Sequence, residues 1–90
     1  MEINIEEELL KDNSTKQKII VKIFSDSMKI YIEAYKNIEL NGAICSHPKT
    51  GAPIENPYLK ISEKQAAVLE KMSRVNRIKS DRVMNLIKEA

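Results

Sequence analysis

The 90-residue sequence has no tryptophan, one phenylalanine and three tyrosines. Aromatic side chains bury the largest apolar areas, so a core with so few of them depends on Ile, Leu, Val and Met, and we expect a thin margin of stability. Two glycines and three prolines are too few for a collagen-like or linker-like chain and leave long stretches free to form helices. The length suffices for one modest core, and we predict a single helical domain over residues 1–90.

Cysteine and long apolar runs are also scarce. Cys45 is the single cysteine, which excludes a disulfide within the chain, and no charged-then-apolar segment at the start resembles a secretion signal. The longest apolar run is Ala66 to Leu69, far below the ~20 residues that cross a bilayer. We therefore expect a cytoplasmic protein with no membrane partner.

Groups that carry catalysis or bind ligands are equally sparse. An activated nucleophile needs a neighbouring base, and the only histidine, His47, lies in an irregular stretch. Cys45 and His47 offer two ligands at most, whereas structural zinc takes four. Gly42 and Gly51 stand too far apart to form a glycine-rich phosphate loop. We expect no enzyme activity, no metal and no cofactor.

The net charge of +2 is unevenly distributed along the chain. Counting Lys and Arg against Asp and Glu gives −4 for residues 1–15, +2 for 16–42, zero for 43–56 and +4 for 57–90. An acidic start and a basic end suit a polyanionic partner or head-to-tail attraction between copies. They also fit the solvated faces of ordinary helices, so charge alone leaves these readings open.

Residues 16–41 carry the pattern of one long helix. Turn and N-cap residues at 12–15 separate it from a short acidic helix within residues 1–15. Neither Gly nor Pro interrupts Lys16 to Leu40, and apolar residues return there at alternating spacings of three and four. These residues are Val21, Phe24, Met28, Tyr31, Tyr35 and Ile38. At ~1.5 Å per residue the helix extends ~37 Å, more than a domain of this size is wide.

The apolar stripe of this helix has a second edge, which widens it beyond what one partner helix covers. This edge consists of Ile20, Ile23, Ile30 and Ala34. Either the other helices of the chain bury the stripe or a neighbouring copy does. We expect a homo-oligomer in which the stripe is the interface. The predicted interface residues are Phe24, Met28, Tyr31, Tyr35 and Ile38.

The rest of the chain predicts a long loop and two shorter helices. Gly42 ends the long helix, and further Gly and Pro residues keep residues 42–56 irregular, a length typical of functional or disordered loops. Residues 57–90 form a basic helical pair, whose first helix starts at Pro57 or Ser62 and ends near Asn76 in a left-handed turn. The last helix opens at Lys79 or Ser80. The predicted fold class is all-α.

Basic residues crowd the stretch that joins the last two helices, and such a ridge can lie along phosphates. The candidate DNA-binding residues are Lys71, Arg74, Arg77, Lys79 and Arg82. A second basic stretch, at Lys16, Lys18 and Lys22, is an alternative location. No aromatic residue interleaves with the main stretch, so stacking on single strands is not supported and double-stranded DNA is the expected partner.

The stretch that begins Asn56-Pro57-Tyr58-Leu59-Lys60-Ile61 resembles phage terminase small subunits, whose C-terminal half reads Asn/His-Pro, a short apolar stretch, a helix, and then Gly-Leu-Thr-Pro-x-Ser-Arg. The resemblance covers about residues 16–84, and Arg82 is similar to the closing Arg of that motif. The chain departs from the motif where Asn76, Arg77, Ile78 and Lys79 replace Gly, Leu, Thr and Pro.

This resemblance implies a ring-forming, non-catalytic protein that binds viral DNA near the packaging start and acts in the host cytoplasm. It also implies a large subunit as partner, whose ATPase and nuclease the small subunit regulates. Two other functions remain open. One is a helix-turn-helix regulator whose last helix, with Arg82, Asn85 and Lys88, enters the major groove. The other is a helical adaptor that binds only protein through Tyr31 and Tyr35.

Overall fold

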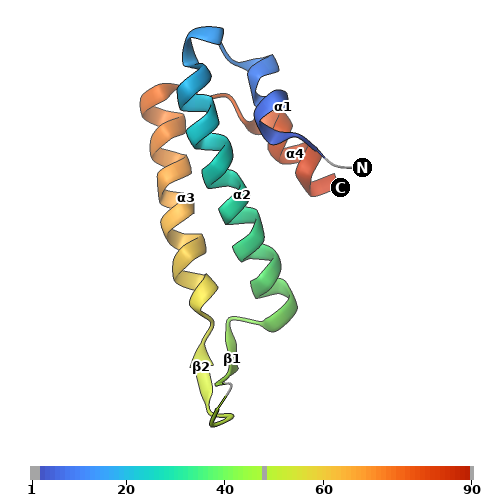
Figure 1. Cartoon of the computed structure of the whole chain (residues 1–90), viewed down its shortest axis with the longest axis vertical. Coiled ribbons are helices and arrows are strands. Elements are labelled where there is room, and N and C mark those ends of the chain that lie inside the picture. Colours follow the sequence, from blue (N-terminus) through green and yellow to red (C-terminus); the bar gives the residue numbers. More distant parts are fainter. Residues whose placement is uncertain (1–2, 48, 90) are drawn as a thin grey trace.

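The computed structural model describes residues 3–47 and 49–89, which form four α-helices and one short β-hairpin (Figure 1). The elements in chain order are α1 (Ile5–Asp12), the 3-10 turn η1 (Thr15–Gln17), α2 (Lys18–Asn41), β1 (Ile44–Ser46), β2 (Pro53–Glu55), α3 (Pro57–Asn76) and α4 (Asp81–Glu89). The predicted helical fold is confirmed in its main part, and the small two-stranded sheet is an addition to it.

Polar caps place the boundary between α1 and α2 where turn residues were predicted. The Asn4 side chain accepts a hydrogen bond from the Glu7 backbone N–H at 3.0 Å and starts α1. Ser14 and Gln17 form a capping box. The Ser14 side chain accepts a hydrogen bond from the Gln17 backbone N–H, and the Gln17 side chain accepts one from the Ser14 backbone N–H. This box orients the first turn of α2.

α2 and α3 are an antiparallel pair, held together by side-chain hydrogen bonds at both ends and in the middle (Figure 1). At the upper end of Figure 1, Gln17 Nε2 donates to the Asn76 carbonyl at 2.7 Å, and in the middle Ser27 Oγ donates to Gln65 Oε1. At the lower end, Asn56 Nδ2 donates to Asn37 Oδ1 at 3.0 Å. These three links fix which turns of the two helices face each other.

Residues 42–56 are not the irregular loop that was expected. The segment folds into a hairpin in which Cys45 pairs with Ile54, and Figure 1 shows it projecting beyond the helix pair. Gly42 enters it at φ 81°, a conformation that favours glycine. Asn56, only 2% exposed, closes it by donating to the Gly42 carbonyl at 2.9 Å. Backbone pairing thus satisfies polar groups that an irregular loop would leave to water.

The structure settles where the last two helices begin and corrects where α3 ends. α3 starts at Pro57, because Asn56 Oδ1 accepts from the Tyr58 N–H at 3.0 Å. Asn76 was expected to be left-handed, but it stays helical with its carbonyl bound to Gln17, and Arg77 takes the left-handed conformation instead (φ 54°, ψ 41°). α4 begins at Asp81, whereas Lys79 or Ser80 was the expected start.

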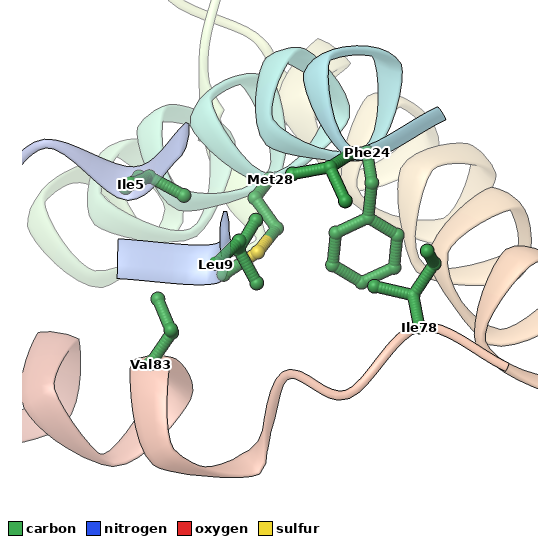
Figure 2. Close-up of a cluster of buried hydrophobic side chains, with 7 residues drawn as sticks. Ile5, Leu9, Phe24, Met28, Ile78 and Val83 are labelled. Carbon is green, nitrogen blue, oxygen red and sulfur yellow. The ribbon is translucent and has the colours of Figure 1, made fainter. Parts of the chain in front are cut away.

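The core lies where α1, α4 and the segment between α3 and α4 meet the first half of α2 (Figure 2). In Figure 2 Leu9 lies beside Met28, and Ile78 lies next to Phe24. The buried residues of this cluster are Ile5, Leu9, Val21, Phe24, Met28, Ile78 and Val83. α3, all of whose residues the structure describes, contributes no fully buried side chain. The core therefore covers one half of the helix pair.

The location of Phe24 and Met28 corrects the predicted oligomer interface. They are 2% and 1% exposed, because α1, α4 and Ile78 cover them within the same chain. A stripe read from one helix cannot show which of its residues the chain itself buries. Of the predicted interface residues, only Tyr31, Tyr35 and Ile38 keep part of their surface exposed.

Phe24→Ala should lower the free energy of unfolding by about 3–5 kcal/mol, since it removes the one aromatic side chain of the core and leaves a cavity. Leu40→Ala is the matched control on the same helix, because Leu40 is 84% exposed, and its change should stay within about 0.5 kcal/mol. Urea denaturation followed by circular dichroism measures both. Equal stability of the two variants would contradict the assignment of this core.

Candidate nucleic-acid interface

Two basic stretches that are far apart in the sequence meet at one end of the molecule. The Gln17 side chain binds the Asn76 carbonyl at 2.7 Å, which places the start of α2 against the end of α3. Asn13 holds the next segment, because its Nδ2 donates to the Lys79 carbonyl at 2.9 Å and its Oδ1 accepts from the Lys79 N–H at 2.8 Å. We call the exposed cations gathered here the basic end: Lys16, Lys18, Lys71, Arg74, Arg77 and Lys79.

Sequence reasoning treated these two stretches as alternative sites, whereas the structure joins them. Lys16 and Lys18 flank Gln17, and Arg77 follows Asn76, so the bond between Gln17 and Asn76 brings both groups to one end. Lys22, the third residue of the alternative site, is exposed one helical turn below Lys18. Nothing in the spacing of charges signals this pairing, because it depends on hydrogen bonds across 59 positions.

The cations of the basic end differ in how free they are. Arg74 Nε lies 3.2 Å from Glu70 Oε1, but both side chains are about two-thirds exposed, so this pair is weak and screened by salt. Lys71, Arg77 and Lys79 form no ion pair within the part of the chain that the structure describes. Phosphate oxygens could therefore bind these three without breaking a contact of the fold.

Arg82, the fifth predicted DNA-binding residue, lines the same hollow as Lys79 but has a structural role. Its Nε donates to Asp12 Oδ2 and its Nη1 to Glu8 Oε2, each at 2.9 Å, while Nη2 donates to the Glu8 carbonyl at 2.8 Å. These bonds attach α4 to α1 and occupy the guanidinium. They also neutralise Asp12, which lies next to Asn13 and thus close to Lys79. We therefore remove Arg82 from the candidate interface.

Arg77 has a left-handed backbone conformation, which residues other than glycine rarely adopt. Among the described residues it is the one non-glycine residue with a positive φ, at 54°. A Cβ atom in this conformation raises the free energy of the folded state, whereas glycine, which has no Cβ, avoids this cost. Such strain is concentrated at functional sites. An exposed arginine at the position where a helix normally ends in glycine points to a use for its charge.

Two of the remaining predicted interface residues, Tyr31 and Tyr35, line a groove between α2 and α4, and Ile38 lies outside it, half-buried. The Tyr31 and Tyr35 rings stack with their centroids 6.4 Å apart, opposite Met84 and Ile87. A hydrogen bond with Glu39 raises the pKa of Tyr35. The groove is thus partly closed by the chain's own last helix, which reduces the surface left for a neighbour.

The hairpin carries the chain's histidine and cysteine but shows no site. His47 Nδ1 accepts from the Lys49 and Thr50 backbone N–H groups at 3.1 and 3.4 Å, so the imidazole stabilises the turn. Over residues 3–47 and 49–89 there is no cluster of three or more His, Cys, Asp or Glu side chains that could hold a metal ion. In the same ranges, no helix has the length and hydropathy needed to span a membrane.

Comparison with known proteins finds no family profile, no curated protein and no solved structure that matches this chain.

The ion pairs around Arg82 predict a loss of stability in acid. Hydrogen bonds from Lys11 and then from Arg82 lower the pKa of Glu8 below its ordinary value of 4.5. A carboxylate whose pKa is lowered by folding stabilises the fold at pH values above its unfolded-state pKa. This contribution disappears as the pH falls through its folded-state pKa. We expect Glu8→Gln to lower the urea midpoint at pH 7 and to converge with the wild type as the pH falls through the lowered pKa of Glu8. Midpoints that run parallel across this range would argue against the contribution.

Arg77→Gly should raise the free energy of unfolding by about 0.5–1 kcal/mol, because glycine adopts the left-handed conformation without strain. Arg77→Ala is the matched control, since alanine removes the same charge but keeps the strained Cβ. Thermal denaturation of the two variants separates backbone strain from charge. If both variants melt alike, the positive φ of Arg77 carries no measurable cost.

Proposed function

We propose that this chain is a non-catalytic DNA-binding protein of the terminase small subunit type. In this role its basic end binds double-stranded viral DNA and presents it to a large subunit that carries ATPase and nuclease activities. The observation that supports the proposal is the convergence of Lys16 and Lys18 with the cations around Arg77 at one end of the molecule.

The chemistry of the basic end favours the DNA backbone over the bases. Its cations are exposed at the junction of two helices and a turn, and contacts of this kind go mainly to phosphates, which position a protein on the duplex. The described residues around it include no exposed aromatic ring on which an unpaired base could stack. Binding should therefore depend strongly on salt and weakly on sequence.

The helix-turn-helix alternative loses support from the same contacts. Of the three residues proposed to enter the major groove, Arg82 is bound to Asp12 and Glu8, so reading a base would require breaking the link between α1 and α4. Asn85 and Lys88 are exposed on α4. Two polar residues on a nine-residue helix leave little capacity for direct readout of sequence.

Replacing Arg77 and Lys79 together by Ala should weaken duplex binding and flatten the slope of log K against log salt by about two, because each lost phosphate contact removes about 0.9 from the slope. Lys16→Ala with Lys18→Ala should act in the same direction if both stretches form one site. Fluorescence anisotropy with a labelled duplex across a salt series measures both effects.

The matched control for this experiment removes two charges away from the basic end. Lys36 lies in the lower half of α2 and Lys49 in the hairpin, and both are exposed. Lys36→Ala with Lys49→Ala should leave the salt slope close to that of the wild type. An equal loss in the control would mean that binding follows net charge alone, and no duplex binding at low salt would refute the proposal.

A further inference from the structure

One face of the helix pair α2–α3 is apolar, and none of the described residues outside the pair packs on it. On α2, Ile19, Ile23 and Ile30 are 78%, 54% and 43% exposed. On α3, Ile61 and Val75 are 38% and 60% exposed. Val68, which is half-buried, lies seven residues from each and so two turns away on the same side of the helix. We call these six residues the open face.

The two stripes of the open face lie on the same side of the helix pair. Ser27 and Gln65 are hydrogen-bonded and mark the seam between α2 and α3. Helical spacing places Phe24 on one side of Ser27 and Ile23 and Ile30 on the other. It likewise places Leu69, which packs against the core with Phe24, on one side of Gln65. The stripe of Ile61, Val68 and Val75 lies on the opposite side. The open face is therefore the reverse of the face that α1 and α4 cover.

The shape of the molecule makes this face large for so small a chain. The radius of gyration is 15.3 Å, whereas a compact chain of this length has about 12 Å, because the helix pair extends beyond its core. The 20 residues of α3 rise about 30 Å, and two packed helices are about 20 Å wide. Each copy of the chain would bury about 600 Å² here, or about 1,200 Å² for both copies together, which lies at the lower end of the range for stable interfaces.

Below Lys22, the two edges of the open face carry opposite charges. Helical spacing places Asp26 and Glu33 along the outer edge of the α2 stripe, with Lys22 a turn before Asp26. The outer edge of the α3 stripe carries Lys60, Lys64 and Lys71. All six side chains are exposed. Within one chain the width of the pair separates these edges, so the acidic edge has no basic partner on α3.

A two-fold axis parallel to the helices would bring these edges together. It places α2 of one copy on α3 of the other without changing height along the pair. Glu33 and Lys60 each lie 16 residues from the contact between Gln17 and Asn76, so both sit about 24 Å below it. Glu33 of each copy then meets Lys60 of the other at matching height, twice in the assembly. Nearer the basic end, Lys22 and Lys71 each lie five residues from that contact and meet as like charges.

We propose that two copies of this chain associate through their open faces into a symmetric dimer, a four-helix bundle in which each α2 lies antiparallel to the α3 of the other copy. The isoleucines of α2 pack against Val75, Val68 and Ile61, and Glu33 pairs with Lys60 and Lys64 across the interface. This inference does not depend on the proposed function, because dimer mass is measured without DNA.

Light scattering during gel filtration of the full chain tests the dimer directly. We expect twice the chain mass for the wild type, and a shift to the monomer mass for Ile23→Glu, with the dimer dissociation constant raised at least tenfold. Ile44→Glu is the matched control, because Ile44 is an apolar residue that is 62% exposed but lies in the hairpin, beyond the helix pair. Circular dichroism checks that all variants fold.

Charge reversal tests the pairing of the edges without touching the apolar residues. Glu33→Lys and Lys64→Glu should each raise the dimer dissociation constant severalfold, and the double variant should restore it, because each copy then offers the reversed edge to its partner. Within one chain the two positions are too far apart for such rescue.

Three results would overturn the inference. They are a monomer at all concentrations, a dimer that Ile23→Glu and Ile44→Glu affect equally, and a double charge reversal that is weaker than either single one. Loss of the dimer with unchanged affinity for duplex DNA would leave the proposed function standing. Loss of DNA binding in a protein that still dimerises would refute only that function.

Discussion

The packing of Phe24 is the constraint on which the rest of the structure depends. With no tryptophan and a single phenylalanine, the chain has one large apolar anchor, and α1, α4 and Ile78 all gather around it and its neighbours on α2. Small domains remove a limited share of their surface from water, so one core of this size cannot also cover the lower half of α2 and α3. The elongated shape and the open face both follow from that shortage.

Polar contacts compensate at the places that the core does not reach. Arg82 joins α4 to α1 with two carboxylates and a carbonyl, and Asn13 holds the segment between α3 and α4 in place. Both contacts border the basic end. The same network that fixes the helices therefore removes nearby negative charge and leaves Lys71, Arg77 and Lys79 unpaired among the described residues.

Much of the fold could be predicted from the sequence because it depends on local signals. The uninterrupted stretch up to Leu40, the turn residues around Ser14 and the Asn56-Pro57 cap each act within a few positions, and the helices begin and end close to where these signals predict. The hairpin was missed because its strands are three residues long and its register depends on pairing, with no alternating apolar pattern to reveal it.

The candidate site was harder to predict because it depends on contacts between distant residues. The charge of Arg82 looks the same in sequence as that of Arg77, and only α1 packed against α4 shows that one is occupied and the other free. The interface prediction failed at Phe24 for a similar reason, since periodicity identifies an apolar stripe but not which part of the protein covers it.

The proposed symmetric dimer closes at two copies, so a ring of the kind that the resemblance implies needs a second contact surface.

The bonds between Arg82 and Glu8 join residues that are 74 positions apart, and this separation has a consequence for how the chain folds. α2, the hairpin and α3 follow one another and can pair over short distances, whereas closing so long a segment costs more conformational entropy. The helix pair should thus form early and the two outer helices dock last. In the native state those outer helices should open before the helix pair does, and their opening would expose the core around Phe24.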